Sequence, residues 1–224
     1  ISLAEGEYIA RIDADDIAVK DRFSRQLNYL RRYDLDMVGG AAVLINEDGC
    51  ELGYSKKPTS KISVDKYIRL ASPCLHPTWL GKIQIFKDIR YKDVSPGQDY
   101  IFLAEAFQAG YKIGNLTERI LYYRVSTQSL SKRRPEETLY IACLVRRAIK
   151  KSKRTDIKQF KAFQNKNNSA LRFLVRLRES LIYKNKNSNV FRRSFSHMLV
   201  LVVSMAHPLL LEDLLANVRL RFLK

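Results

Sequence analysis

The stretch GEYIARIDADD, residues 6–16, places an apolar segment directly before three carboxylates. Residues 8–12 have the composition of a buried strand, and Asp13 and Asp15 follow at its end. In an extended segment the side chains of residues i and i+2 point to the same side. We therefore expect Asp13 and Asp15 to point at one place from the end of a central strand, which is where open α/β sheets bind ligands.

Two neighbouring carboxylates repel each other unless a cation lies beside them. Mg²⁺ or Mn²⁺ suits this arrangement, because one or two carboxylates and the phosphates of a substrate suffice to hold such an ion. The alternative is a helix N-terminus, where Asp side chains accept hydrogen bonds from free N–H groups and interact favourably with the helix dipole. Asp16 is a candidate cap under either interpretation.

The composition is that of a folded protein. Of 224 residues, 46% are hydrophobic and 10% are aromatic, which excludes wholesale disorder. The cysteines Cys50, Cys74 and Cys143 are far apart and show neither a metal-binding spacing nor a disulfide framework. Their pattern favours a reducing compartment and predicts a cytoplasmic protein.

Strand and helix patterns alternate up to Pro135. The apolar spacing predicts a helix within residues 15–33, with Phe23, Leu27 and Leu30 on one face. The other predicted elements before Pro135 are a strand at 37–45 with a turn at 47–49, loops at 51–66 and 72–82, a helix at 98–110 after the Pro96–Gly97 turn, and two short strands at 111–116 and 120–125.

After Pro135 the pattern is helical. An amphipathic helix carries Ile141, Leu144, Val145, Ala148 and Ile149, a Lys/Asn-rich linker covers 151–168, and a second amphipathic helix covers 171–182. We therefore predict an α/β region at 1–135 followed by a helical tail at 136–224.

The positive charge is concentrated in that tail. Residues 1–135 carry 21 basic and 17 acidic side chains, a net +4, whereas residues 136–224 carry 19 and 6, a net +13. The basic helices and the apolar stretch 198–211, which is too short to span a bilayer, predict a tail lying in a membrane interface. The alternative is that these helices pack on the first region and expose their Lys and Arg side chains to water.

Several ordered blocks resemble family 2 glycosyltransferases of the GT-A fold. The blocks are AEGEYIARIDADDIAVKDRFSRQLNYL at 4–30, DMVGG at 36–40, LHPTWLGK at 75–82 and GQDYIFLAEAFQAGYKIGNLTERILYYRVSTQSLS at 97–131. The resemblance covers residues 1–135 and is closest to bacterial enzymes that build capsule, exopolysaccharide (as in amylovoran synthesis) or lipopolysaccharide. It implies the C-terminal part of a Rossmann-like domain with a mixed sheet, whose first βαβ units would precede Ile1.

The resemblance assigns roles to the carboxylates. Asp13-Ala14-Asp15 matches the DxD motif, which holds Mn²⁺ or Mg²⁺ on the diphosphate of a nucleotide-sugar donor, most often a UDP-sugar. Asp99 matches the base that deprotonates the acceptor hydroxyl, which gives inversion at the anomeric carbon. Gln98 stands where the family commonly has Glu and still offers hydrogen bonds to an acceptor. The alternative for Asp99 is a helix cap.

Other positions match the family pattern less closely. His76 is expected to line the acceptor site or to be structural. Arg22, with Gln26, positions the donor or acceptor or lies on a solvated helix face. Arg124 is expected at the diphosphate, since Ser126 replaces the His of many relatives. Lys132 or Arg133 could also contact the phosphates, and Trp79 stacks on a sugar or packs in the core.

The sequence thus predicts an inverting glycosyltransferase on the cytoplasmic membrane surface, acting on a glycan or polyprenyl-linked acceptor. The Gln-x-x-Arg-Trp signature of processive enzymes is absent from the sequence, which favours addition of a single sugar. The alternatives are a nucleotidyltransferase of related fold, a basic nucleic-acid-binding protein and a non-catalytic partner subunit. Nucleic-acid binding is disfavoured because the charge excess avoids the aromatic-rich first region.

Overall fold

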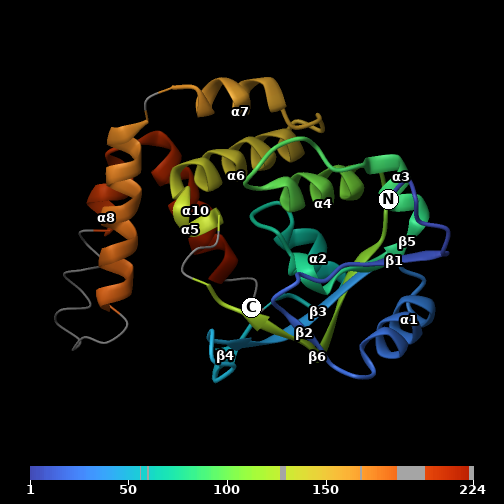
Figure 1. The fold of residues 1–224 in the computed structure, drawn as a ribbon. Coiled ribbons are helices and arrows are strands. Elements are labelled where there is room, and N and C mark those ends of the chain that lie inside the picture. Colours follow the sequence, from blue (N-terminus) through green and yellow to red (C-terminus); the bar gives the residue numbers. More distant parts are fainter. Residues whose placement is uncertain (56, 60, 127–129, 167, 186–199, 222–224) are drawn as a thin grey trace.

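The chain forms a mixed β-sheet with helices on both faces (Figure 1). The structure is a computed structural model and describes residues 1–224 except 56, 60, 127–129, 167, 186–199 and 222–224. The sheet order is β1 (Tyr8–Ala10), β5 (Leu80–Lys82), β3 (Met37–Ile45), β6 (Ile113–Arg124), β2 (Ile17–Ala18), with β4 (Glu51–Tyr54) also pairing with β3. β3 and β6 pair in parallel and the other pairs are antiparallel, which confirms the predicted α/β class with a mixed sheet.

Helix α1 (Arg22–Arg32) lies on one face of the sheet, and most other helices lie on the opposite side (Figure 1). These are α2 (Lys61–Tyr67), α3 (Ile83–Ile89), α4 (Gln98–Gln108), α5 (Leu130–Arg133), α6 (Pro135–Lys150), α7 (Ile157–Gln164), α8 (Ser169–Asn185) and α10 (Pro208–Arg221), together with the 3₁₀ turn η1 (His76–Thr78). Leu30 of α1 packs on Val38 and Leu80 of the sheet, while α4 and α6 share a larger core on the other side.

Strand β1 differs from its prediction in length and place. It ends at Ala10, is only half-buried and lies at an edge of the sheet, where its described partner is β5. Beyond Ala10 the backbone still runs along β5, because the Arg11 N–H donates to the Trp79 carbonyl at 2.8 Å. The expectation of a central strand that continues to Ile12 was therefore wrong.

Several elements were missed or divided wrongly. The predicted loop at 51–66 contains β4 and α2, and the predicted loop at 72–82 contains η1 and β5. The two short strands predicted at 111–116 and 120–125 form one strand, β6, whose pairing with β3 shifts register between Gly39 and Ala42. These irregularities interrupt the apolar alternation, so the sequence shows two runs where the backbone forms one strand.

The buried face of α1 is not the predicted one. Leu30 is buried as expected, but Phe23 is 53% exposed and the polar side chains of Arg22 and Gln26 are fully buried. Because the inward stripe includes polar side chains, the apolar spacing alone gave the wrong orientation. The prediction that the Arg22 face is solvated was wrong.

The tail begins inside the main core. Ile141, Leu144, Val145 and Ile149 of α6 are buried in one cluster with α4, as the amphipathic pattern indicated. The predicted linker 151–168 contains α7, whose Phe160 joins the same cluster. The apolar face of α6 is therefore covered by protein, which fits the alternative that this helix packs on the first region; membrane contact of the tail stays a prediction.

The later helices form a second cluster against α6. Leu171 and Val175 of α8 meet Leu209 and Leu210 of α10 there, beside Leu139 and Cys143 of α6. Of the apolar stretch 198–211, residues 198 and 199 lie outside the described residues, residues 200–205 are helical, and α10 begins at Pro208. Among the residues that the structure describes, no helix combines the length and apolar character needed to cross a membrane.

Candidate active site

The loop between β1 and β2 carries the three carboxylates of the opening stretch. A turn closes it, since the Asp16 N–H donates to the Asp13 carbonyl at 3.2 Å. The Arg11 guanidinium forms an ion pair with Asp13, with Nη2 and Oδ1 at 2.6 Å. Asp15 is exposed. The loop thus carries a partly neutralised Asp13 and an exposed Asp15. A turn replaces the extended segment expected here, so a common direction for the two side chains stays a prediction.

Asp16 anchors this loop to β6. Its Oδ1 accepts a hydrogen bond from the Arg124 N–H at 2.8 Å, and its Oδ2 is buried without a partner among the described residues. Burial, together with the charges of Asp13 and Asp15, raises the pKa of Asp16 to about 6. The N-cap of α1 is Asp21, so the expectation that Asp16 caps the helix was wrong.

Arg124 fastens two loops to each other. Its Nε donates to the Asp15 carbonyl at 3.0 Å, and its Nη1 donates to the carbonyls of Asn46 and Glu47 at 2.7 and 2.6 Å. The side chain therefore fixes the backbone that carries Asp15. A contact of Arg124 with a diphosphate stays a prediction.

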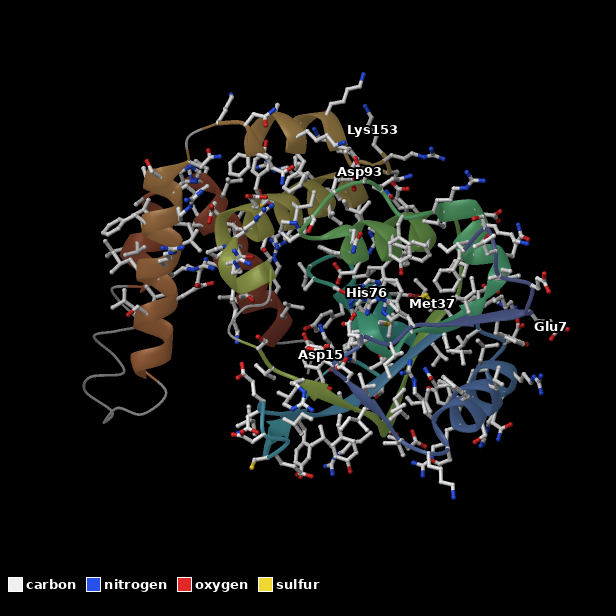
Figure 2. All side chains as sticks on the ribbon, viewed as in Figure 1. Glu7, Asp15, Met37, His76, Asp93 and Lys153 are labelled. Atoms are coloured by element: carbon white, nitrogen blue, oxygen red, sulfur yellow. The ribbon has the colours of Figure 1, made fainter. Side chains whose placement is uncertain are left out.

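Asp99 reaches the same region from a distant part of the chain. It lies in the first turn of α4, whose N-cap is Gly97, and no described group forms a hydrogen bond with its carboxylate. The cap interpretation of Asp99 is therefore not observed. The charges of Asp99 and Asp13 both act on His76, and those of Asp13, Asp15, Asp16 and Asp99 all act on Tyr123. Tyr123 and His76 thus lie among the predicted carboxylates, and Figure 2 shows Asp15 and His76 in the middle of the molecule.

His76 is held in an aromatic setting. Its Nε2 is 2.8 Å from the Tyr91 hydroxyl, and its ring packs edge-on against Trp79 with centroids 4.4 Å apart. Burial lowers the pKa of His76 to about 4, so the ring is neutral at physiological pH. Trp79 is completely buried and also packs against Phe102. Of the two roles predicted for Trp79, the structure supports core packing.

Arg22 and Gln26 form hydrogen bonds that support the backbone around the carboxylate loop. Arg22 Nη2 donates to the Arg11 carbonyl at 2.7 Å, and its Nε donates to Gln26 Oε1 at 2.9 Å. Gln26 Nε2 donates in turn to the Thr78 carbonyl at 2.7 Å. These bonds hold the start of the carboxylate loop against the segment after His76. An acceptor contact by Arg22 stays a prediction, while the contacts observed are all with the protein.

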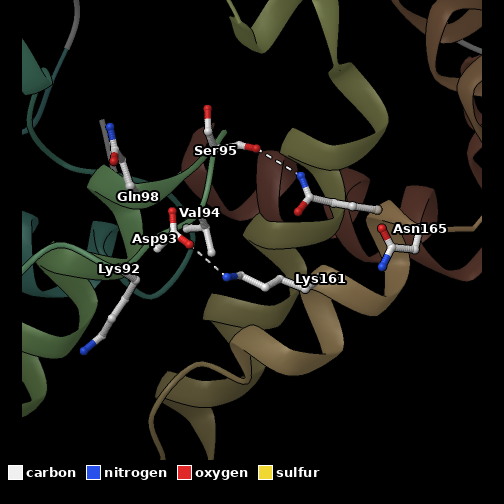
Figure 3. Close-up of a pocket in the computed structure, with 8 residues that line it drawn as sticks. Lys92, Asp93, Val94, Ser95, Gln98, Lys161 and Asn165 are labelled. Atoms are coloured by element: carbon white, nitrogen blue, oxygen red, sulfur yellow. Dashed lines mark hydrogen bonds and ion pairs between the residues drawn. The ribbon is translucent and has the colours of Figure 1, made fainter.

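Gln98 lies at the rim of a polar pocket beside α4 (Figure 3). The cavity measures about 530 Å³ and is lined by Lys92, Asp93, Val94, Ser95, Gln98, Lys161, Gln164 and Asn165. Ion pairing of Lys161 with Asp93 and a hydrogen bond from Gln164 to the Ser95 carbonyl join α7 to the loop before α4. The tail helix α7 thus forms one wall of a pocket lined by Gln98, the residue before Asp99 in the sequence.

Four residues near the carboxylates were missed: Arg11, Lys57, Tyr91 and Tyr123. The Lys57 amine is buried, donates to the Ser72 carbonyl at 2.8 Å and lies within the influence of Asp99. Two of the four had a signal in the sequence. Arg11 precedes Asp13 by two residues in an extended segment, and Tyr123 follows the buried Leu121 by two in β6. Lys57 and Tyr91 lie in loops that carry no such pattern.

The carboxylate loop fits a divalent cation shared with a substrate. No group of three or more His, Cys, Asp or Glu side chains in the described part of the chain could hold a metal alone. Two carboxylates with substrate phosphates are nonetheless enough for Mg²⁺ or Mn²⁺. The mutual repulsion of Asp13, Asp15 and Asp16, and the unpartnered Oδ2 of Asp16, are features that a cation would relieve.

A protein-family model matches the first part of the chain. Residues 1–90 match the family described as Glycosyl transferase family 2. The matched region, which is less than half of the chain, contains the carboxylate loop, Arg22 and His76, whereas Asp99 and Arg124 lie beyond it.

Curated relatives with similar sequences are named as glycosyltransferases, and two of them are named for O-antigen and amylovoran biosynthesis. An uncharacterised glycosyltransferase of Methanocaldococcus jannaschii is 31% identical over 128 residues, 56% of this chain and 44% of the relative. The O-antigen biosynthesis glycosyltransferase WbnJ of Escherichia coli is 32% identical over 55% of this chain and 50% of its own length. The amylovoran biosynthesis glycosyltransferase AmsE of Erwinia amylovora is 24% identical over 56% of this chain and 48% of its own length. The chain spans about half the length of these relatives.

Among solved structures, the chain is similar to TarS 1–349 of S. aureus in complex with UDP-GlcNAc. The identity is 18%, the TM-score is 0.48, and the match covers 67% of this chain and 44% of TarS 1–349.

Proposed function

We propose that this protein transfers a sugar from a nucleotide-diphosphate sugar to a glycan or lipid-linked acceptor, with inversion, during synthesis of a bacterial surface polysaccharide. The family match over residues 1–90 supports a glycosyltransferase. The relatives named for O-antigen and amylovoran biosynthesis support a polysaccharide product.

The observation that supports the proposal is that two carboxylate groups distant in the sequence act electrostatically on the same two side chains. The loop with Asp13 and Asp15 follows β1, and Asp99 begins α4 more than eighty residues later. Both act electrostatically on His76 and on Tyr123. A sugar-transfer site needs one group for the diphosphate and another for the acceptor hydroxyl, and this arrangement is consistent with both roles.

The donor side is assigned to the carboxylate loop. Asp13 and Asp15 would hold Mn²⁺ or Mg²⁺ together with the donor diphosphate, and the cation neutralises charge on the leaving group. Arg124 keeps Asp15 in place through the Asp15 carbonyl, and Arg11 balances the charge of Asp13. A UDP-sugar is the donor we propose.

The acceptor side is assigned to α4 and η1. Asp99 would take the proton of the acceptor hydroxyl as a general base. Its carboxylate is half-buried and has no hydrogen bond to a described residue, so it is available to a bound hydroxyl. The neutral His76 offers a hydrogen bond, and Gln98 brings the acceptor to the pocket of Figure 3.

The test measures metal binding and sugar transfer in the same set of variants. Mn²⁺ binding by calorimetry, in the presence of UDP, should weaken at least about tenfold in Asp15→Asn, whereas Asp99→Asn should bind Mn²⁺ as the wild type does. Hydrolysis or transfer of UDP-sugars should fall at least about 100-fold in both variants, in line with the loss of a general base in Asp99→Asn. Asp21→Asn, on the exposed start of α1, is the matched control and should change neither property.

The outcomes separate the parts of the proposal. Unchanged Mn²⁺ binding in Asp15→Asn would contradict the assignment of the cation to Asp15. Full turnover by Asp99→Asn would contradict the role of Asp99 as the general base. If the wild-type protein bound no nucleotide sugar with Mn²⁺ present, the glycosyltransferase activity itself would be rejected.

A further inference from the structure

A second cavity lies away from the carboxylates, between α2, α6 and α10. It measures about 810 Å³. We call it the tail cleft, and it is lined by Lys66, Arg69, Leu70, Arg146, Arg147, Ile149, Lys150, Glu212, Leu215, Ala216 and Arg219. Three segments distant in the sequence therefore build one hollow with six basic side chains and one carboxylate.

Part of this charge is used to assemble the cleft. Arg146 has a side chain only 9% exposed; it donates to the Leu70 carbonyl and pairs with Asp213. Arg147 pairs with Glu212, with Nη2 and Oε2 at 2.8 Å. These contacts tie α10 and the end of α2 to α6, so the shape of the cleft does not depend on a ligand.

The remaining cations have no acidic partner. Among the described residues, Lys66, Arg69, Lys150 and Arg219 form no ion pair, and all four are exposed at the rim. Four unneutralised cations around one hollow favour an anion, and the carboxylates that could oppose it are already engaged by Arg146 and Arg147.

The floor of the cleft is apolar. Leu70, Ile149, Leu215 and Ala216 line it, and Leu215 is 50% exposed although it faces the hollow. An inorganic anion bound at the rim would leave the apolar floor in contact with water. A ligand with a charged head and a hydrocarbon part covers the floor and meets the rim at the same time.

We propose that the tail cleft binds the phosphate headgroup of an anionic membrane phospholipid, with the adjoining hydrocarbon on Leu70 and Leu215. Lys66, Lys150 and Arg219 contact the phosphate. The site extends beyond the proposed sugar transfer and does not depend on it. Nucleic acid suits the cleft less well, because no aromatic ring lines it for a base to stack on.

The inference also changes how the tail meets a membrane. The apolar face of α6 is buried against α4, so α6 cannot insert that face into lipid. The cleft instead offers a preformed binding site beside α6. A lipid headgroup can bind there without any helix unfolding.

The experiment is co-sedimentation of the full chain with vesicles. Vesicles of phosphatidylcholine containing phosphatidylglycerol are compared with vesicles of phosphatidylcholine alone. Each basic side chain near an anionic surface adds about 1 kcal/mol, so reversing two rim charges in K66E/R219E should weaken partition at least about tenfold. The control K158E/K166E reverses two exposed charges near α7 and changes the net charge equally. It should stay within about twofold of the wild type.

A further variant tests the apolar floor. Leu215→Ser keeps every charge and should weaken vesicle binding about threefold or more, because it removes exposed apolar surface from the cleft. Equal loss in K66E/R219E and in K158E/K166E would show diffuse charge attraction and overturn the proposal. Binding only to polyprenyl phosphate, and not to the phosphatidylglycerol vesicles, would overturn it too. Circular dichroism establishes that each variant is folded, and no step requires sugar transfer.

Discussion

Arg22 shows how a charged side chain can be buried for a structural purpose. It is 1% exposed, and burial lowers its pKa to about 10, so it remains a cation at physiological pH. It holds the Arg11 carbonyl, which precedes the carboxylate loop, and the Gln26 side chain, which holds Thr78. The position of the loop therefore depends on a side chain that the sequence pattern would place in solvent.

Replacing Arg22 should destabilise the fold strongly. In Arg22→Met the buried carbonyl of Arg11 and the amide of Gln26 lose their partner, so we expect the free energy of unfolding to fall by about 3 kcal/mol. Arg25→Met, three residues on, removes only a surface pair with Asp21 and should cost less than about 0.5 kcal/mol. Urea unfolding measures both. Equal, small effects would show that these hydrogen bonds are not needed.

His76 gives the stability a defined dependence on pH. Its folded-state pKa of about 4 lies below the usual 6.5, so the unfolded chain binds more protons between these values. Stability from this group is complete above pH 6.5 and is lost as the pH falls toward 4. Between pH 7 and pH 5 this group alone lowers the free energy of unfolding by about 1–2 kcal/mol, while Asp16, with its raised pKa, acts in the opposite direction.

The comparison that isolates this contribution is His76→Gln, which cannot take up a proton. Denaturant unfolding at pH 7 and pH 5 should show a smaller loss in the variant than in the wild type, by about the same 1–2 kcal/mol. His207, a half-exposed side chain outside the site, supplies the matched variant His207→Gln. An identical pH dependence in wild type and His76→Gln would assign the effect to other groups.

At the scale of elements, the sequence predicted helices and strands correctly where apolar residues followed a regular helical or strand spacing. The α4 helix between Gly97 and Gly110, the α6 helix and the β3 strand were predicted from their apolar patterns and turn residues. It failed at β4, where Leu52 and Tyr54 are exposed, because an edge strand outside the core shows no inward alternation. It also failed at α3 and α7, because each spans only about two turns, which is too short for a helical period to be recognised.

The candidate site was predictable only in part for a related reason. Asp13, Asp15 and Asp99 follow motifs that are local in sequence, so their types and spacing were visible. Lys57 and Tyr91 enter the same region from loops, and only the tertiary fold places them beside Asp99. Side chains that act through long-range packing leave no periodic signal along the chain.

Gly97 controls how α4 begins and hence where Asp99 lies. It has φ +92°, and an added Cβ would meet Ile141 Cγ2 of α6 at 2.5 Å. Gly110, at the other end of α4, has φ +88° with nothing within 4 Å of an added Cβ. Gly110→Ala should therefore cost only the left-handed strain of about 1–2 kcal/mol. Gly97→Ala adds overpacking and should cost about 1–3 kcal/mol more.

Thermal unfolding ranks these two variants, and activity separates them further. Because Asp99 follows Gly97 by two residues, a shift of the α4 start should lower sugar transfer in Gly97→Ala and leave Gly110→Ala active. Equal stability of the two variants would mean that α6 gives way without cost at this contact.

At the scale of the whole molecule, the α/β region and the tail are not independent. Ile141 and Phe160 of the tail lie in one core with Trp79 and Phe102, and α7 forms a wall of the pocket at Gln98. The composition changes at Pro135, but the hydrophobic core contains residues from both sides of this position. Asp213 of α10 extends this integration, since it accepts from Arg146 of α6 and Arg178 of α8.

Asp213 should therefore decide whether α8 and α10 stay docked. In Asp213→Ala, Arg146 and Arg178, which are 9% and 11% exposed, lose a shared carboxylate and keep their buried charge. We expect the free energy of unfolding to fall by about 2–4 kcal/mol. Limited proteolysis should then cut within residues 150–221 first, leaving the α/β region protected. Asp21→Ala removes an exposed pair instead and should change neither property. If Asp213→Ala were digested as slowly as the wild type, the apolar contacts of Leu171, Val175 and Leu210 would hold the tail without this network.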